Sequence, residues 1–484
     1  MRKYSNQKGI VKSINLPNEL MQFVKKDTYS LIIKGSAGTG KTTLSLTILK
    51  ALDIKDNFFY ICTRVSPKQL LLSYPWIAKF KETQKERGPV PEVGEMDVPM
   101  NFEDARLDEP ESLFERITNE LMDVKAPLII IDSWDAVASF MDREARLNNE
   151  RVLQTWRERA GAKIIFVNED PNDTSLDFVV DGAVKLDQIV YEDVRIREIS
   201  LLKLRGIKIS KHSYTFTLNN SNFRSFQTYN PRNFAINPDI ITPFPLDKKK
   251  NNALPLLREH GSIKTGYKEL DTNLGGGFPR RGIVVLEVDS KINIAVPMAF
   301  LLKIVVTFLN CDSVVFFEPP VSVDATSAGI YLKSYPTLLQ TGSHKFFWLG
   351  PQAHGLTEPS SSEPNKNHGA YLLENLYDNT SKERQSEPDR PILNIMPLSR
   401  VQTLNSRAKK EHLDFTRQKI DLTIFVARKN ESSQWAMEVC DIFLKMIVVK
   451  GSLFLRTLYP LSPVLAMEVK NSSGYPIANL LPLV

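Results

Sequence analysis

Residues 35–42 read GSAGTGKT and match the phosphate-binding pattern G-x-x-x-x-G-K-[ST] in full. The apolar run Ser30 to Ile33 precedes it, and the helix-like stretch Thr42 to Leu52 follows it. In this strand-loop-helix setting the backbone N–H groups of the loop curl around phosphate oxygens, and the amino terminus of the helix adds a favourable dipole. The pattern therefore predicts a nucleotide-binding α/β domain.

The loop also assigns roles to single side chains. We expect Lys41 to reach the β and γ phosphates of ATP and Thr42 to bind Mg²⁺. The predicted nucleotide-binding residues are Gly35, Ser36, Ala37, Gly38, Thr39, Gly40, Lys41, Thr42 and Thr43. ATP and Mg²⁺ are thus the expected cofactors.

A second acidic position completes such a site. The run APLIIIDSWD places Asp132 directly after a series of apolar residues. An aspartate at the end of a strand next to the phosphate loop holds magnesium through water. Asp132 is therefore the second predicted metal residue. The alternative is a buried strand that ends at an aspartate without binding metal.

Short β-branched runs alternate with amphipathic stretches in the first half of the chain. The apolar runs lie at 30–33, 58–62, 128–131 and 163–167, and helix-like spacing occurs at 42–52, 110–122 and 142–159. This order predicts a mainly parallel sheet with helices on both faces. The 484 residues exceed one ordinary core. We expect an ATP-binding domain at 1–229, a linker at 230–260, and a second domain at 261–484 with a disordered insertion at 355–391.

The composition limits which partners, metal sites and cellular compartments the sequence predicts. The formal net charge of +6 is too small to predict a nucleic-acid partner. Cys62, Cys311 and Cys440 form no C-x-x-C pair, which argues against a disulfide framework and a cysteine zinc site. The amino terminus lacks the apolar core of a signal peptide, and Pro297 and Lys303 interrupt the longest apolar region. We expect a cytoplasmic protein without a membrane span.

Two further segments of the first half carry a family resemblance. Residues 180–186 read VDGAVKL, and residues 195–206 read RIREISLLKLRG. Together with IDS at 131–133, they resemble the RecA superfamily and, within it, the KaiC-like ATPases. The resemblance implies that Lys203 and Arg205 are catalytic residues, which reach the γ-phosphate bound by a neighbouring subunit of a homo-oligomer and spread its charge. The alternative is that Lys203 and Arg205 are outward residues of an exposed strand.

The segment after the next strand departs from that family. KaiC-like domains carry one or two glutamates there, which orient the attacking water, whereas this chain has Thr63 and Arg64. A threonine cannot act as a general base at neutral pH. Either another acid, Asp135 or Glu169, takes this role, or hydrolysis is slow. ATP binding is therefore expected, and ATP hydrolysis stays open.

The second half of the chain opens with a related lead-in. Residues 265–282 read TGYKELDTNLGGGFPRRG and resemble the start of a KaiC-like domain. When the two halves are aligned, the second half has other residues at the positions that would touch phosphate or metal. Val288 stands at the position of Gly35, Asn293 at that of Gly40, Ile294 at that of Lys41 and Ala295 at that of Thr42. In the strand at 391–397, Asn394 is expected in place of the metal aspartate. We therefore predict a degenerate second RecA-like domain. An unrelated α/β domain with a chance GGGFP turn is the alternative.

One intact and one degenerate unit, with TRVSP at 63–67, resemble the archaeal gas-vesicle regulatory GvpD-like family. The resemblance implies a nucleotide-dependent regulator that restrains a transcriptional activator, so a regulatory protein is the expected partner. Two alternatives stay open: a RecA-type DNA-dependent ATPase of recombination or repair, and a scaffold whose nucleotide never turns over. The arginine-rich segment 142–159 is a candidate patch, although its interleaved acids favour an exposed helix. The basic run 195–211 contains few aromatic residues and supports a nucleic-acid surface only weakly.

Overall fold

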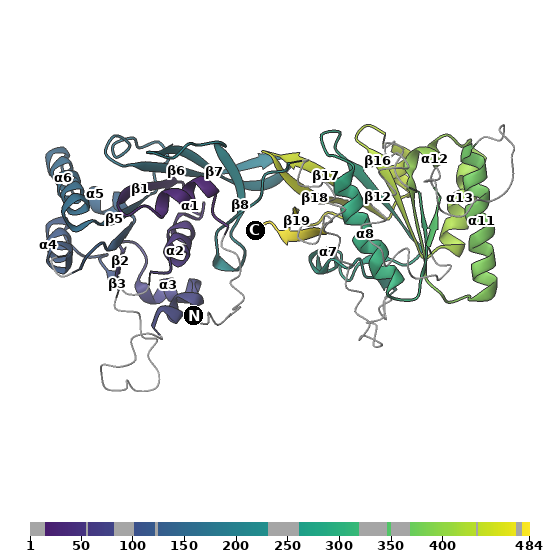
Figure 1. Cartoon of the computed structure of the whole chain (residues 1–484), viewed down its shortest axis with the longest axis horizontal. Coiled ribbons are helices and arrows are strands. Elements are labelled where there is room, and N and C mark those ends of the chain that lie inside the picture. The colour runs from purple at the N-terminus through teal and green to yellow at the C-terminus, as the bar shows by residue number, and fades with distance from the viewer. Residues whose placement is uncertain are drawn as a thin grey trace, which may run out of the picture. The chain divides into compact units, whose positions relative to one another are not determined.

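The protein is described by a computed structural model, which covers residues 15–54, 57–81, 101–121, 124–230, 261–318, 346–349, 368–431, 434–470 and 477–484. The chain divides into two compact units. The first comprises Met1–Phe226 together with Leu483–Val484, and the second comprises Gln227–Pro482. Each unit is built around one large sheet with helices beside it (Figure 1).

The sheet of the first unit has nine strands in the order β3-β2-β4-β5-β1-β6-β7-β8-β9. The first six strands in this order, β3, β2, β4, β5, β1 and β6, run parallel to one another. β7, β8 and β9 then continue the sheet in antiparallel pairs. The elements of this unit are α1 (Asn18–Val24), β1 (Tyr29–Gly35), α2 (Lys41–Ala51), β2 (Phe58–Cys62), α3 (Pro67–Ser73), η1 (Pro75–Lys81), β3 (Phe102–Asp104), α4 (Pro110–Leu121), β4 (Leu128–Asp132), α5 (Trp134–Ala138), α6 (Arg143–Ala160), β5 (Lys163–Asn168), β6 (Gly182–Tyr191), β7 (Val194–Leu204), β8 (Ser213–Thr217), η2 (Asn219–Ser221) and β9 (Arg224–Ser225).

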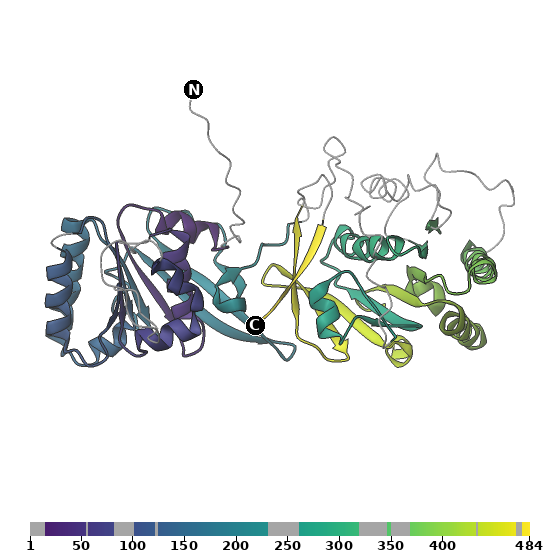
Figure 2. The same ribbon diagram turned by 90° about the horizontal axis from the view of Figure 1, so that it is seen from below.

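The central strand β1 is buried on both faces. Leu31 and Ile33 belong to the apolar cluster that includes residues of α1 and α2, whereas Ile32 belongs to the cluster that includes residues of α4, α5 and α6. A strand covered on both sides needs an uninterrupted apolar run, which is why the sequence reads SLII here. Figure 2 shows helices on either side of this sheet.

The second unit repeats this plan with the strand order β14-β13-β15-β16-β12-β17-β18-β19-β20. Its elements are β10 (Ser262–Ile263), α7 (Lys268–Asn273), β11 (Phe278–Pro279), β12 (Gly282–Val288), α8 (Ala295–Leu309), β13 (Val314–Phe317), β14 (Phe346–Trp348), α11 (His368–Ser386), β15 (Ile392–Pro397), α12 (Leu398–Gln402), α13 (Ser406–Lys419), β16 (Leu422–Arg428), α14 (Gln434–Val439), β17 (Ile442–Val449), β18 (Ser452–Tyr459), β19 (Leu465–Lys470) and β20 (Ile477–Pro482).

The two large sheets correspond strand for strand, from β1 with β12 to β6 with β17. The same backbone bond fixes the register in each: Asp181 N donates to Ser30 O at 3.0 Å, and Asp441 N donates to Ile283 O at 2.8 Å. Ile283 is thus equivalent to Ser30, and Val288 is equivalent to Gly35. This confirms the prediction of two tandem, mainly parallel RecA-like domains.

α11 corrects the expectation of a disordered insertion at 355–391. Residues 350–367 lie outside the described residues, but 368–386 form this helix and 392–397 form β15. Leu372, Leu373 and Leu376 are buried, so the helix packs an apolar stripe on the core. Arg384 donates to the buried carboxylate of Asp421 at 2.6 Å, which anchors the polar end of the helix. The polar composition of the segment concealed this stripe.

α8 contains the longest apolar run of the chain. Most of its residues are buried, because it packs on the sheet of the second unit as a core helix. Among the residues that the structure describes, no helix is long and apolar enough to cross a membrane.

Candidate nucleotide-binding site

The predicted phosphate loop connects β1 to α2 at the carboxyl edge of the parallel strands. Ser36, Ala37 and Gly38 form its exposed tip. Gly40, the residue before α2, has a φ of 102°, a left-handed conformation that favours glycine. This turn leads the chain directly into the helix, so the amino terminus of α2 faces the loop, as in sites that bind phosphate.

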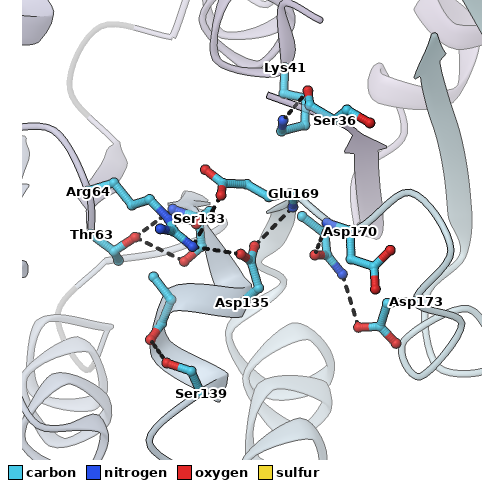
Figure 3. Close-up of polar contacts among 12 residues, drawn as sticks. Ser36, Lys41, Thr63, Arg64, Ser133, Asp135, Ser139, Glu169, Asp170 and Asp173 are labelled. Atoms are coloured by element: carbon cyan, nitrogen blue, oxygen red, sulfur yellow. Dashed lines mark hydrogen bonds and ion pairs between the residues drawn. The ribbon is translucent and has the colours of Figure 1, made fainter. Parts of the chain in front are cut away.

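Lys41 folds back over the loop, as Figure 3 shows for its contact with Ser36. Its Nζ donates to the carbonyl oxygens of Gly35 at 2.7 Å and Ser36 at 2.9 Å. Burial lowers the pKa of Lys41, and among the nearby charges the carboxylate of Glu169 opposes this shift most, followed by that of Asp132. The ammonium group therefore lies on the loop and within the field of carboxylates at the strand ends.

Two predicted contact residues use their side chains for local structure. The hydroxyl of Thr39 donates to Ser36 O at 2.8 Å, and the hydroxyls of Thr43 and Tyr74 share a hydrogen bond of 2.7 Å. Thr43 is buried. These two side chains thus brace the loop and the helix.

Thr42 and Asp132 meet at the edge of the sheet. The Thr42 hydroxyl donates to Asp132 Oδ2 at 2.8 Å, and the Tyr60 hydroxyl donates to the same oxygen at 2.6 Å. Burial raises the pKa of Asp132, while these two hydrogen bonds lower it. A hydroxyl and a carboxylate are oxygen ligands of the kind that Mg²⁺ takes together with phosphate oxygens. The donor set beside the loop thus fits this ion.

Arg64 connects the loops that follow three neighbouring strands (Figure 3). Its guanidinium donates through Nη2 to Asp135 Oδ2 at 3.0 Å, lies 3.1 Å from Glu169 Oε2, and donates through Nε to Ser133 Oγ at 3.2 Å. Thr63, the other residue at the position expected for glutamates, donates from its hydroxyl to Ser133 O at 2.9 Å. Asp135 and Glu169 are therefore the carboxylates near this position.

Two residues that the sequence did not assign to the site also touch the loop. Arg197 on β7 and Gln188 on β6 both donate to the carbonyl oxygen of Gly38, at 2.8 Å and 3.0 Å. Gln188 and Arg197 are directly paired across the two strands. The hairpin register places them over the loop, and the spacing of residues along the chain did not reveal that register.

The structure places Lys203 and Arg205 at the other end of the sheet from the phosphate loop. Gly35, at the carboxyl end of β1, pairs with Leu186 of β6. Leu204 pairs with Gly182 of β6, which in turn pairs with Leu31 near the beginning of β1. Lys203 Nζ donates to the carbonyl oxygens of Asp177 and Val180, at 2.9 Å and 2.6 Å.

Arg205 lies beside this lysine, at the same end of the sheet. It donates to Asp181 Oδ1 at 3.0 Å, and 63% of its side chain is exposed. Neither residue reaches the loop of its own domain. Arg205 is exposed, whereas Lys203 is partly buried.

The corresponding loop of the second unit, residues 289–294, is built from its own hydrogen bonds. Asp289 Oδ1 accepts from Lys291 N at 2.9 Å, and Asn293 Oδ1 accepts from Ala295 N at 2.9 Å. Ile292 is buried in the apolar core of this unit. The N–H groups of Lys291 and Ala295 thus donate to side chains of the same segment.

Strand register corrects the residue expected at the position of Asp132 in the second unit. Val167 pairs with Ile33 and Asp132, and the equivalent Val426 pairs with Leu286 and Pro397. The equivalent of Asp132 is therefore Pro397, and Asn394 lies three positions earlier, buried within β15. Asn394 was expected because it is the polar residue of that strand. The position still carries no acid.

Comparisons with known proteins agree with this geometry. Residues 20–205 match the family model of the GvpD gas vesicle protein, P-loop domain. Protein GvpD2 of Halobacterium salinarum is 27% identical over 317 residues, which cover 63% of this chain and 61% of that protein. Protein GvpD1 of the same organism is 28% identical over 318 residues, with coverage of 63% and 56%.

The circadian clock oscillator protein KaiC of Parathermosynechococcus lividus is 24% identical over 266 residues, which cover 52% of this chain and 45% of that protein. The chain thus spans less than two thirds of the length of these curated relatives. The complete loop, the strand order and these matches lead to one assignment. Residues 20–205 match the P-loop domain of the GvpD gas vesicle protein, and the chain is similar to the GvpD and KaiC proteins.

Proposed function

We propose that the first domain binds ATP and Mg²⁺ at Gly35–Thr42. The observation that carries this proposal is the hydrogen bond between Thr42 and Asp132, which joins the two magnesium residues beside a complete phosphate loop. Lys41 holds the β and γ phosphates, and Thr42 and Asp132 hold the ion directly or through water. When bound, Mg²⁺ neutralises charge on the phosphates.

The bound nucleotide acts as a switch on a regulatory protein partner, with transcriptional regulation as its setting. A ligand shifts a conformational equilibrium only if it binds the two states with different affinity. Arg197 and Gln188 supply a physical link, because both connect the loop carbonyl of Gly38 to the β6–β7 hairpin. A rearrangement of the loop on ATP binding therefore reaches the hairpin, whose Val190 is 77% exposed.

Residues of the basic run 195–211 do not favour a DNA-dependent ATPase. Arg197 and Lys203 donate to backbone carbonyl oxygens of their own domain, which removes them from a continuous cationic surface. Hydrolysis that DNA stimulates, together with salt-dependent DNA binding, would reverse this preference.

The test is calorimetric titration of the full chain with ATP in Mg²⁺ buffer. Lys41→Ala should abolish measurable binding, because it removes the ammonium that faces the phosphates. Lys34→Ala is no suitable control, since Lys34 is buried in β1 and pairs with Asp177 at 2.6 Å. Lys50→Ala is a better one, because Lys50 lies at the far end of the same helix. Equal ATP affinity in the parent chain and Lys41→Ala would overturn the proposal.

A further inference from the structure

Two carboxylates near Lys41 have no role in the proposed binding site. Glu169 directly follows β5, the neighbour of β1, and Asp135 lies in α5, three residues after Asp132. The backbone N–H of Glu169 donates to Asp135 Oδ1 at 3.0 Å, so the two are held side by side (Figure 3). Among the charges around Lys41, that of Glu169 opposes the burial-induced lowering of its pKa most strongly. Because β5 lies beside β1 and the two run parallel, Glu169 stands at the same edge of the sheet as the phosphate loop.

The second unit provides an internal comparison for these acids. Val167 and Val426 are equivalent, so Glu169, two residues after Val167, corresponds to Arg428. Asp132 and Pro397 are also equivalent, so Asp135, three residues after Asp132, corresponds to Arg400. Both acids are therefore replaced by arginine in the unit that lacks the phosphate-loop residues. Arg428 donates to Ile292 O in the altered loop at 2.8 Å, and Arg400 donates to Glu318 at 2.5 Å.

A structural ion pair behaves differently in the same comparison. Asp181 pairs with Arg157 in the first unit, and the equivalent Asp441 pairs with Arg417 in the second. The repeat thus keeps an ion pair that supports the sheet and loses the two acids at the loop edge. The presence of Asp135 and Glu169 coincides with the presence of the phosphate loop, which ties them to its chemistry.

Arg64 limits what the carboxylate of Glu169 can do. The guanidinium contacts both Glu169 and Asp135 and is half exposed, while the Glu169 side chain is 37% exposed. A carboxylate oxygen that accepts from arginine offers fewer free lone pairs to a water molecule. Arg64 therefore restrains the carboxylate of Glu169.

We propose that Glu169 is the catalytic carboxylate of slow ATP hydrolysis and that Arg64 is a positioning residue that restrains it. The inference rests on the ATP binding proposed above. The water oxygen forms a bond to the γ-phosphorus, and the bond from that phosphorus to the β,γ-bridging oxygen breaks, with its electron pair left on ADP. Glu169 accepts a proton of the attacking water and later releases it to solvent.

The test compares Arg64→Gln, Glu169→Gln and the double variant in the full chain. Single-turnover hydrolysis, with the chain in excess over ATP, should rise about tenfold in Arg64→Gln and fall about a hundredfold in Glu169→Gln, the lower range for removal of a general base. The double variant should match Glu169→Gln, because Arg64 acts through this glutamate. Arg407→Gln is the matched control, since it removes an exposed arginine that pairs with a glutamate in the second unit and should leave the rate unchanged.

Calorimetry supplies a readout besides hydrolysis. The ratio of ATP to ADP affinity should stay unchanged in Arg64→Gln, whereas an arginine that contacts the γ-phosphate would lower this ratio when removed. Arg64→Lys, which keeps the charge and loses the fork, should give an intermediate hydrolysis rate.

Four outcomes would overturn the inference. A lowered ATP to ADP ratio in Arg64→Gln would make Arg64 a phosphate ligand. Persistence of the raised rate in the double variant would remove Glu169 from the chemistry. If ATP binds normally but the hydrolysis rate changes in neither Arg64→Gln nor Glu169→Gln, this inference alone is overturned. If the parent chain fails to bind ATP, the proposed function is overturned as well.

Discussion

The hydroxyl of Thr42 donates a hydrogen bond of 2.8 Å to Oδ2 of Asp132, although 90 positions separate the two residues in the sequence. Because this contact joins the two proposed magnesium residues, we expect Asp132→Asn to weaken Mg²⁺-dependent ATP binding about tenfold, which equals about 1.4 kcal/mol. ATP affinity in EDTA should not change, since asparagine keeps the shape of the side chain and loses only its charge.

Calorimetric titrations in Mg²⁺ and in EDTA check this prediction. Tyr60→Phe is the matched control, because it removes the other hydroxyl that donates to Asp132 and keeps the carboxylate. An equal loss of affinity in both buffers would contradict a role of Asp132 at the metal.

The second prediction concerns stoichiometry. We expect one nucleotide per chain, because Val288 and Ile292 belong to the core where the first domain has its loop, and Arg428 donates to Ile292 O. Equilibrium dialysis with labelled ATP should therefore saturate at one ATP per chain. Lys41→Ala should retain none, and a residual site in this variant would place a nucleotide in the second unit.

The repeated ion pairs provide a matched stability experiment. Arg157 and Asp181 are mostly buried, with 18% and 14% of their side chains exposed, whereas Arg417 and Asp441 are 45% and 33% exposed. We expect Arg157→Ala to lower the unfolding free energy by about 2–3 kcal/mol, because it leaves a buried carboxylate short of a partner. Arg417→Ala should cost under about 1 kcal/mol.

Urea unfolding of the full chain measures both values. ATP affinity should be unaffected by Arg157→Ala, since Asp181 bonds to Ser30 at the start of β1 and the phosphate loop lies at its end. Equal costs in the two units would show that burial does not set the energy of these pairs.

A buried histidine should make the stability of the second unit depend on pH. Burial lowers the pKa of His412 from 6.5 to about 4, and the Tyr377 hydroxyl lies 2.7 Å from its Nδ1. Between these two pH values the unfolded chain binds a proton that the folded chain does not, so this stability is present above pH 6.5 and is lost as the pH falls. We expect a loss of about 2 kcal/mol between pH 7 and pH 5.

The measurement is urea unfolding at both pH values for the parent chain and His412→Phe. The variant removes the titrating ring and should have a flatter pH dependence, whatever its stability at pH 7. Tyr377→Phe keeps the imidazole and should keep the dependence. A parent chain with the same pH dependence as His412→Phe would contradict the prediction.

Much of the fold followed from local sequence. The loop motif and the apolar run before it predicted the β1–α2 unit, and the GGGFP lead-in predicted a second copy of the domain. Each of these motifs can be recognised from a few consecutive residues. Contacts that depend on strand register did not follow. Arg197 reaches Gly38 because the pairing of β6 with β7 sets Arg197 opposite Gln188, and both side chains donate to this carbonyl oxygen.

The same limit explains the error at Asn394. Residue type pointed to the polar residue of the strand, but the pairing with β16 decides equivalence and selects Pro397. α11 was missed for another reason, since three buried leucines within a polar segment are a weak periodic signal. Composition reports the average of a segment, whereas a helix needs only one apolar face.

The last prediction concerns the proposed action of Lys203 and Arg205 on a neighbouring subunit. Both lie at the end of the sheet opposite the phosphate loop of their own chain, so a phosphate contact has to be made between chains. In the second unit, Tyr459 pairs with Phe443 as Lys203 pairs with Ala183, so the unit that lacks the loop residues also lacks this lysine. We expect Arg205→Ala to bind ATP and to hydrolyse it about a thousandfold more slowly, the lower range for loss of an arginine supplied in trans.

Complementation distinguishes an action in trans from a structural role. Lys41→Ala cannot bind ATP but presents an intact Arg205, whereas Arg205→Ala binds ATP and needs a neighbour's arginine. Mixing the two, at a concentration where the chain self-associates, should therefore restore hydrolysis above the sum of the separate rates. The Lys41→Ala/Arg205→Ala double variant is the control partner, because it associates without supplying the arginine. Hydrolysis that stays at the sum would leave Arg205 as a partner of Asp181 alone, since the two are joined at 3.0 Å within one chain.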